Sequence, residues 1–141
     1  MDVQFLGGAG EVGRSAILVN DRLLLDYGVQ SATPMQYPVG DVAPEAVVVS
    51  HGHLDHAGAV PTLLSGDRRP EIHWTPPTAA LTRTLARDTL KLHGGTMQCP
   101  FTQTHVARLG EVECRHGYRE SFEAAGHEVT FYDAGHIPGS A

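Results

Sequence analysis

The stretch that decides the fold is Val47–Pro61, which reads VVVSHGHLDHAGAVP. It belongs to a run of β-branched residues, Ala46–Ser50, whose continuous apolar character predicts a strand buried on both faces of a sheet. The polar segment His51–His56 follows this strand as a loop, and Ala57–Leu64 has the composition of a short helix. We therefore expect a buried strand, then a polar loop, then a short helix.

Four residues of this loop are of the types that bind divalent metal ions. The alternation of His51 and His53 in an extended turn places both imidazoles on the same side of the chain. Asp55 and His56 lie at the start of the predicted helix and can turn toward a second point. Each pair suits one of two neighbouring ions, and imidazole with carboxylate favours zinc, with manganese or iron as alternatives. The other interpretation, a solvated surface cluster, fits poorly between two apolar segments.

Two residues elsewhere in the chain are candidates for the same site. His136 follows a predicted strand, Glu128–Tyr132, in a glycine-flanked loop, and we predict that it is the third ligand of the ion held by His51 and His53. Asp26 ends a predicted strand, where a buried and unpaired carboxylate would be costly, and we expect it to orient a ligand histidine. The remaining histidines are expected on the surface or packed, and they are His73, His93, His105, His116 and His127.

A glycine-rich segment near the start gives a competing motif. Gly8, Gly10 and Gly13 follow a predicted strand, Val3–Leu6, in the spacing of a dinucleotide-binding loop, with Asp26 as the later acid. Such a site needs a helix and a further strand between the last glycine and the acid. Here that interval reads instead as a hairpin of two short strands, so we expect the glycines to provide a sharp turn beneath the site.

The rest of the chain predicts strands followed by strands and helices in alternation, which is an α/β (α+β layered) class. Thr75-Pro76-Pro77 predicts a helix start and Gly94 predicts its end, with Leu81, Leu85 and Leu92 on one face of that helix. Ile72–Thr75 is a further strand candidate, and the segment 96–117 gives no clear pattern.

Composition limits the class of protein. The 141 residues fit one domain and contain no apolar run long enough to span a membrane. The first residues lack the features of a signal peptide, so we expect a cytoplasmic protein, and the two cysteines, Cys99 and Cys114, are expected to be reduced. The formal net charge of −6 gives no indication of a nucleic-acid surface on this segment.

In these motifs the sequence resembles the metallo-β-lactamase superfamily, whose His-x-His-x-Asp-His signature is matched by His51–His56. Four longer segments look like its β-CASP branch, which includes archaeal and eukaryotic cleavage and polyadenylation specificity factor nucleases and ribonuclease J. These segments are Gly7–Ala16, Leu23–Gly28, Val47–Pro61 and Gly135–Ala141. The likeness covers nearly the whole chain and is thin across residues 96–126.

The resemblance implies an αββα sandwich, of which residues 1–141 would be the amino-terminal part of one domain, without the β-CASP insertion. It implies hydrolysis of RNA phosphodiesters by metal-activated water, with two zinc ions per complete site, manganese remaining an alternative. It further implies catalytic roles for Asp55 and Asp26. The implied metal ligands are His51, His53 and His136 for one ion, and Asp55 and His56 for the other.

Two ligands of the family, a bridging aspartate and a late histidine, have no match up to Ala141. We therefore expect an incomplete second metal site and RNA contacts made mainly by other parts of the protein, and whether the isolated segment is active stays open. Dimerisation of the full-length protein stays open. Two other functions also stay open: a small-substrate hydrolase of the same fold, such as a thioesterase or lactonase, and a non-catalytic metal-binding subunit.

Overall fold

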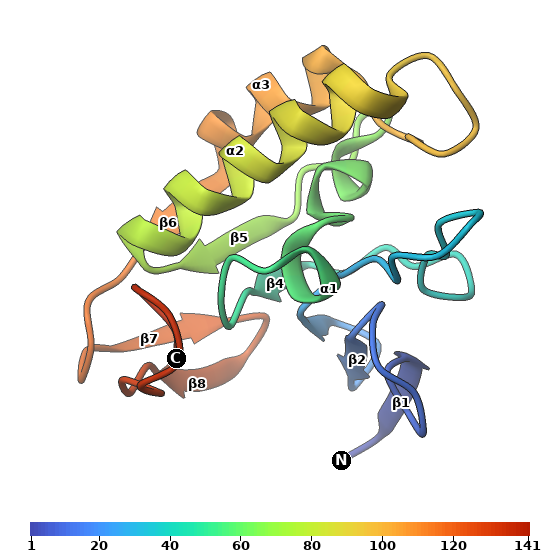
Figure 1. Cartoon of the computed structure of the whole chain (residues 1–141). Coiled ribbons are helices and arrows are strands. Elements are labelled where there is room, and N and C mark those ends of the chain that lie inside the picture. Colours follow the sequence, from blue (N-terminus) through green and yellow to red (C-terminus); the bar gives the residue numbers. More distant parts are fainter.

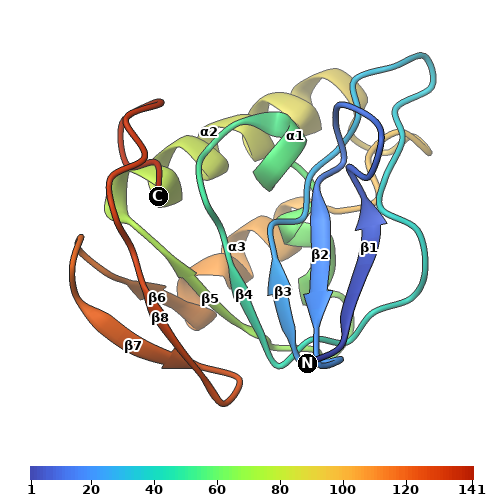
Figure 2. The ribbon, with the colours of Figure 1, turned by 90° about the horizontal axis from the view of Figure 1, so that it is seen from below.

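A computed structural model describes residues 1–141 as one six-stranded sheet with helices on one face and a two-stranded hairpin on the other (Figure 1). The sheet order follows the chain from β1 to β6 (Figure 2). Its strands are β1 (Val3–Gly7), β2 (Ala16–Val19), β3 (Leu23–Leu25), β4 (Ala46–Val48), β5 (Glu71–Trp74) and β6 (Glu113–Arg115). The pairs β1–β2 and β2–β3 are antiparallel, and the pairs from β3 to β6 are parallel.

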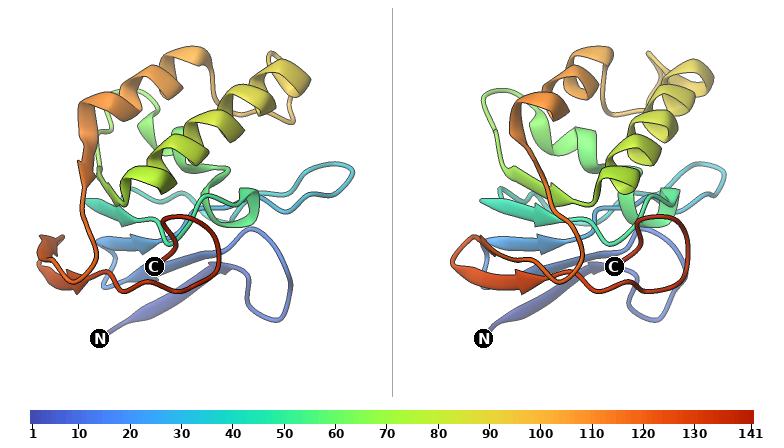
Figure 3. Two further views of the ribbon diagram at one scale, coloured as in Figure 1. Left: turned by 60° about the vertical axis from the view of Figure 1, so that its left-hand side comes forward. Right: turned by 90° about the vertical axis from the view of Figure 1, so that its left-hand side faces the viewer.

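The helical layer covers one face of the sheet (Figure 3), and the main core lies between the helices and this face. It contains α1 (Leu54–Ala57), a 3₁₀ turn η1 (Val60–Leu64), α2 (Pro76–His93) and α3 (Gln103–Val112). Leu24, Val47 and Ile72 reach the main core on this side, where Trp74 and Leu109 are also fully buried. Because β4 is buried on both faces, its sequence is apolar without alternation. None of the helices combines the length and the apolar character needed to cross a lipid bilayer.

The opposite face of the sheet is partly covered by the hairpin of β7 (Ser121–Ala124) and β8 (His127–Thr130). Its two-residue turn, Ala125-Gly126, has positive φ at both positions, as a tight hairpin turn requires. A smaller core lies between the hairpin and the sheet, and its buried members are Val19, Leu23, Ala46, Val48, Ala124 and Phe131.

The parallel strands bring the polar loops to one edge of the sheet. Asp26 directly follows β3, and His51 lies just beyond the end of β4. The end of the chain returns to the same edge, where the Ala141 amide donates a hydrogen bond to the carbonyl of Ser50 at 2.9 Å. Residues far apart in the sequence therefore meet where parallel strands end, which is the usual place for a site in a parallel sheet.

The predicted α/β class is confirmed, as are the hairpin of β2 and β3 and the bounds of α2. The predicted helix Ala57–Leu64 is wrong in its bounds, because α1 starts earlier, at Leu54, and a separate 3₁₀ turn follows. The leucines that share one face of α2 are not its buried residues. Leu92 is 76% exposed, whereas small and β-branched residues face the sheet, since they let the helix approach it closely. These buried residues are Thr78, Ala79, Thr82, Ala86 and Thr89.

Candidate metal centre

Three histidines form a triangle at the edge where β4 ends. The rings of His51, His53 and His136 have centroids 5.0 Å apart in each of the three pairs, and the rings meet edge to face. The ligand atoms of these residues lie within 4.8 Å of one another. Three imidazoles converging on one point from two distant segments suit a divalent ion of the zinc type.

A second group adjoins the triangle. His51, Asp55 and His56 also place one ligand atom each within 4.8 Å of one another. The rings of His51 and His56 are 4.2 Å apart, and His56 Nε2 is 3.7 Å from a carboxylate oxygen of Asp55. The side chains of His53 and His136 are solvent-exposed, while those of Asp55 and His56 are half-buried. Both groups therefore face solvent enough to admit an ion.

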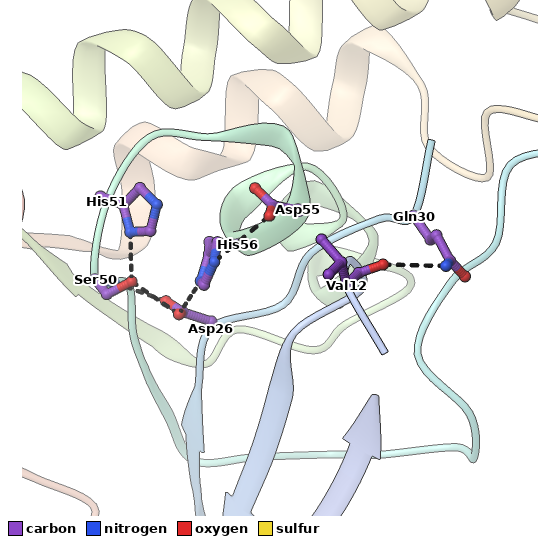
Figure 4. A network of polar contacts seen from close by, with 7 residues as sticks. All are labelled: Val12, Asp26, Gln30, Ser50, His51, Asp55 and His56. Carbon is purple, nitrogen blue, oxygen red and sulfur yellow. Dashed lines mark hydrogen bonds and ion pairs between the residues drawn. The ribbon is translucent and has the colours of Figure 1, made fainter. Parts of the chain in front are cut away.

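Asp26 holds this arrangement together from beneath (Figure 4). Its carboxylate accepts hydrogen bonds from the Ser50 amide at 2.7 Å and from the Ser50 hydroxyl at 2.8 Å. The same carboxylate lies 2.7 Å from His56 Nδ1. Asp26 is only 8% exposed, so these three contacts replace the water that an ionised carboxylate would otherwise require.

These contacts determine which nitrogen of each imidazole is free. A carboxylate only accepts hydrogen bonds, so His56 donates from Nδ1 to Asp26, and its Nε2 keeps a lone pair for a metal. The one hydroxyl proton of Ser50 is directed to Asp26, so the 2.9 Å contact between Ser50 Oγ and His51 Nδ1 is donated by the ring. His51 Nε2 is then also a lone-pair donor, as metal binding requires.

The electrostatics of His51 and His56 differ. The hydrogen bond to Asp26 raises the pKa of His56 above its ordinary value. Burial, followed by the neighbouring His56, lowers the pKa of His51, so this ring stays neutral more readily. A proton therefore competes with a metal more strongly at His56 than at His51.

His136 is positioned by contacts of its loop with the start of α2. The carbonyl of Gly139 accepts hydrogen bonds from the hydroxyls of Thr75 at 2.7 Å and Thr78 at 3.2 Å. Within the loop, the hydroxyl of Ser140 accepts from the His136 amide at 3.1 Å. The threonines at the start of α2 thus bring a residue from the far end of the chain to the centre.

The structure brings together every residue predicted for the site, which are Asp26, His51, His53, Asp55, His56 and His136. Sequence reasoning missed Ser50, which links Asp26 to His51 although it carries no catalytic signature of its own. It also gave no role to Gly28 in the site.

The glycine-rich segment forms the loop between β1 and β2, as expected, and no helix follows it. The side chain of Gln30 fixes this loop by donating a hydrogen bond to the carbonyl of Val12 at 3.0 Å (Figure 4).

Gly28 lies against the backbone of the His51–His56 loop. A Cβ atom at this position would come within 1.8 Å of the Asp55 carbonyl oxygen. On either side of Gly28, the amides of Tyr27 and Val29 donate to the carbonyls of His56 and Leu54 at 2.9 and 3.0 Å. This pairing places Asp55 and His56 over Asp26, and it requires a residue without a side chain.

Replacing Gly28 with alanine is expected to displace Asp55 and His56, because backbone atoms rather than a flexible side chain oppose the new methyl group. We expect a loss of about 3 kcal/mol in the free energy of unfolding, measured by urea denaturation. The matched control is Gly110→Ala on α3, where a Cβ meets nothing within 4 Å and stability should hold or rise. Equal stability of the two variants would contradict the close approach.

Comparison with known proteins agrees with this geometry. The sequence profile of the metallo-beta-lactamase superfamily matches residues 9–136. The chain is 38% identical to the protein named RNase aCSPSF2 of Saccharolobus solfataricus, covering 99% of this chain and 29% of that protein. It is 36% identical to an RNase J-like protein of Methanocaldococcus jannaschii, covering 99% of this chain and 32% of the relative. It is also 36% identical to the transcription termination factor FttA of Methanosarcina mazei, covering 99% of this chain and 24% of that protein.

The chain thus spans about a third or less of the length of these curated relatives. The family profile covers most of the chain, from the glycine-rich loop to His136, and so includes every residue of the candidate centre. These matches and the histidine triangle lead to the same conclusion: the chain belongs to the metallo-β-lactamase superfamily, in its β-CASP branch.

Proposed function

We propose that this chain forms part of a longer, cytoplasmic metal-dependent ribonuclease that hydrolyses RNA phosphodiester bonds. The observation that carries the proposal is the histidine triangle beside a second ligand group at one edge of the sheet. The names of two relatives, an RNase and an RNase J-like protein, support RNA as the substrate. Their length supports the view that these residues are one segment of a larger enzyme.

We assign the metal-binding roles by the lone pairs that the structure leaves free. His51, His53 and His136 would hold one ion, and Asp55 and His56 would contribute to a second. When bound, divalent ions of the zinc type, or manganese, would activate water and offset charge on the phosphoryl oxygens. Asp26 and Ser50 lie behind the ligands and accept the Nδ1 protons of His56 and His51, so that Nε2 of each ring is left to face the site.

Asp26 and Asp55 have different roles in this proposal. Asp26 is a positioning residue, because its carboxylate is saturated by Ser50 and His56 and lies beneath them. Asp55 is more exposed, with 39% of its side chain accessible, and its carboxylate can accept a proton at the mouth of the site. Ser50 is not assigned as a nucleophile, because its hydroxyl is already hydrogen-bonded to Asp26 and His51.

The test is cleavage of single-stranded RNA by the longer protein with and without a chelator. We expect cleavage that is lost when metal is removed and restored by added zinc or manganese. A protein that turns over a thioester or lactone but leaves RNA intact would instead be a small-substrate hydrolase. Metal binding without any turnover would indicate a non-catalytic subunit, and either result would overturn the proposal.

A further inference from the structure

A second group of metal-binding residue types lies on the face of the sheet that carries the hairpin. In the parallel pair of β5 and β6, His73 is directly opposite Cys114. Glu71 lies two residues before His73, and His116 lies two residues after Cys114. Because side chains alternate along a strand, all four project from the same face of this pair.

The side-chain atoms of this group are close together. His73 Nε2 lies 3.0 Å from a carboxylate oxygen of Glu71, and His73 Nδ1 lies 2.8 Å from His116 Nε2. The ligand atoms of Glu71, His73 and Cys114 lie within 4.8 Å of one another. Three different ligand types therefore converge at one point, and His116 contacts the central imidazole from behind.

The two imidazoles are held firmly, whereas the other ligands are accessible. His73 is only 3% exposed, and Phe122 of the hairpin stacks on the ring of His116 at 3.7 Å and on that of His73 at 4.9 Å. Glu71 and Cys114 line an open hollow at the start of these strands. An ion can therefore approach from solvent toward a fixed imidazole.

The charged neighbours of the group are already paired. Arg69 lies 3.3 Å from Glu111, and Glu113 is bound by Arg83 at 2.8 Å and by Arg115 at 3.0 Å. The ion pair of Glu71 is with His73 alone. No arginine thus competes with a cation for the carboxylate of Glu71.

We propose that Glu71, His73 and Cys114 form a separate site for one transition-metal ion of the zinc type. Carboxylate, imidazole and thiolate are all zinc ligands, and a water molecule would complete a tetrahedral set. A thiolate among three ligands selects such borderline-soft ions over magnesium or calcium. His116 would act as a positioning residue, because its ring fixes the orientation of His73 through Nδ1.

The protons balance when an ion binds. Without metal, His73 carries its proton on Nε2, toward Glu71, and accepts from His116 Nε2 at Nδ1. With metal, His73 carries its proton on Nδ1 and donates it to His116 Nε2, and the proton of His116 resides on Nδ1. Burial raises the pKa of Cys114, so the thiol is protonated beforehand and releases one proton to solvent on binding.

Cobalt(II) is the probe, because a bound thiolate gives an intense near-ultraviolet charge-transfer band that histidine and carboxylate ligands do not give. Titration of the reduced chain with Co²⁺ should produce this band. Cys114→Ser should abolish it, and Cys99→Ser, a control in which the other thiol is removed, should keep it. Glu71→Gln should weaken the apparent Co²⁺ affinity by more than about 10-fold, since a direct ligand is lost.

Several results would overturn this assignment: no band in the wild-type chain at excess Co²⁺, or a band that persists in Cys114→Ser while that variant keeps the wild-type circular dichroism spectrum. His53→Ala should retain the band, because His53 lies in the other centre, and its loss there would also count against a separate site. The readout does not depend on RNA cleavage, so its failure is distinguishable from failure of the proposed function.

Discussion

Replacing His53 with alanine in the longer protein is expected to lower the rate of RNA cleavage by about 10³-fold. The ring of His53 is one corner of the histidine triangle, 5.0 Å from the rings of His51 and His136. Its loss removes one of three ligands and with it several kcal/mol of the transition-state stabilisation that a bound ion provides, and about 4 kcal/mol corresponds to this change in rate.

The substitution should leave the fold intact, which makes the result interpretable. The His53 side chain is exposed and makes no capping hydrogen bond at the start of α1. The start of α1 instead depends on the backbone carbonyl of His53, which accepts hydrogen bonds from the amides of His56 and Ala57. Alanine preserves both of these hydrogen bonds.

His127→Gln is the matched control for this experiment. His127 is also a histidine of the chain, but it lies on β8 and contacts the side chain of Asn20 at 3.0 Å. We expect the control to cleave RNA at the wild-type rate in single-turnover assays, and metal content should fall only in His53→Ala. Wild-type cleavage by His53→Ala would refute the role of the triangle.

Asp26→Asn is expected to weaken metal binding by about 10- to 100-fold although it changes few atoms. Asp26 has a positive φ of 59°, a conformation that asparagine tolerates well, so the backbone should persist. The new amide nitrogen donates where the carboxylate accepted. The asparagine side chain cannot accept hydrogen bonds from both Ser50 and His56. His56 must then accept at Nδ1 and carry its proton on Nε2, which is the atom that a metal would need.

Asp21→Asn provides the control, because Asp21 also has a positive φ, 57°, and lies on the exposed turn between β2 and β3. The affinity of each variant for zinc can be measured by competition with a chromophoric chelator. Urea denaturation should show a loss of about 2 kcal/mol for Asp26→Asn, since buried donors lose their partner, and little change for Asp21→Asn. Unchanged zinc affinity in Asp26→Asn would contradict the positioning role.

The candidate ligands of the principal centre are visible in the sequence because most of them are close together in it. His51, His53, Asp55 and His56 fall within six positions, so their chemistry is visible without any knowledge of the fold. Their supports could not be found this way. Ser50 and Gly28 act through contacts with residues distant in the sequence, and neither residue type in isolation indicates such a contact.

Helix α2 shows the same division between local and tertiary information. Its start after Thr75 and its end before Gly94 are encoded by neighbouring residues, and both predictions are confirmed. Which face is buried depends on how closely the helix approaches the sheet, and the buried residues are threonines and alanines, which the sequence pattern did not indicate. Likewise, His73 and His116 are 43 positions apart, and only the register of β5 and β6 brings them together.

The histidine triangle has a consequence for folding as well as for catalysis. Two of its corners precede residue 54 and the third is His136, so an ion held by all three closes a loop of about 80 residues. Such an ion is a reversible cross-link, comparable in topology to a disulfide between the same segments. Supply of the metal during synthesis would then determine when the loop that carries His136 docks, and without metal this loop would be more accessible to proteases.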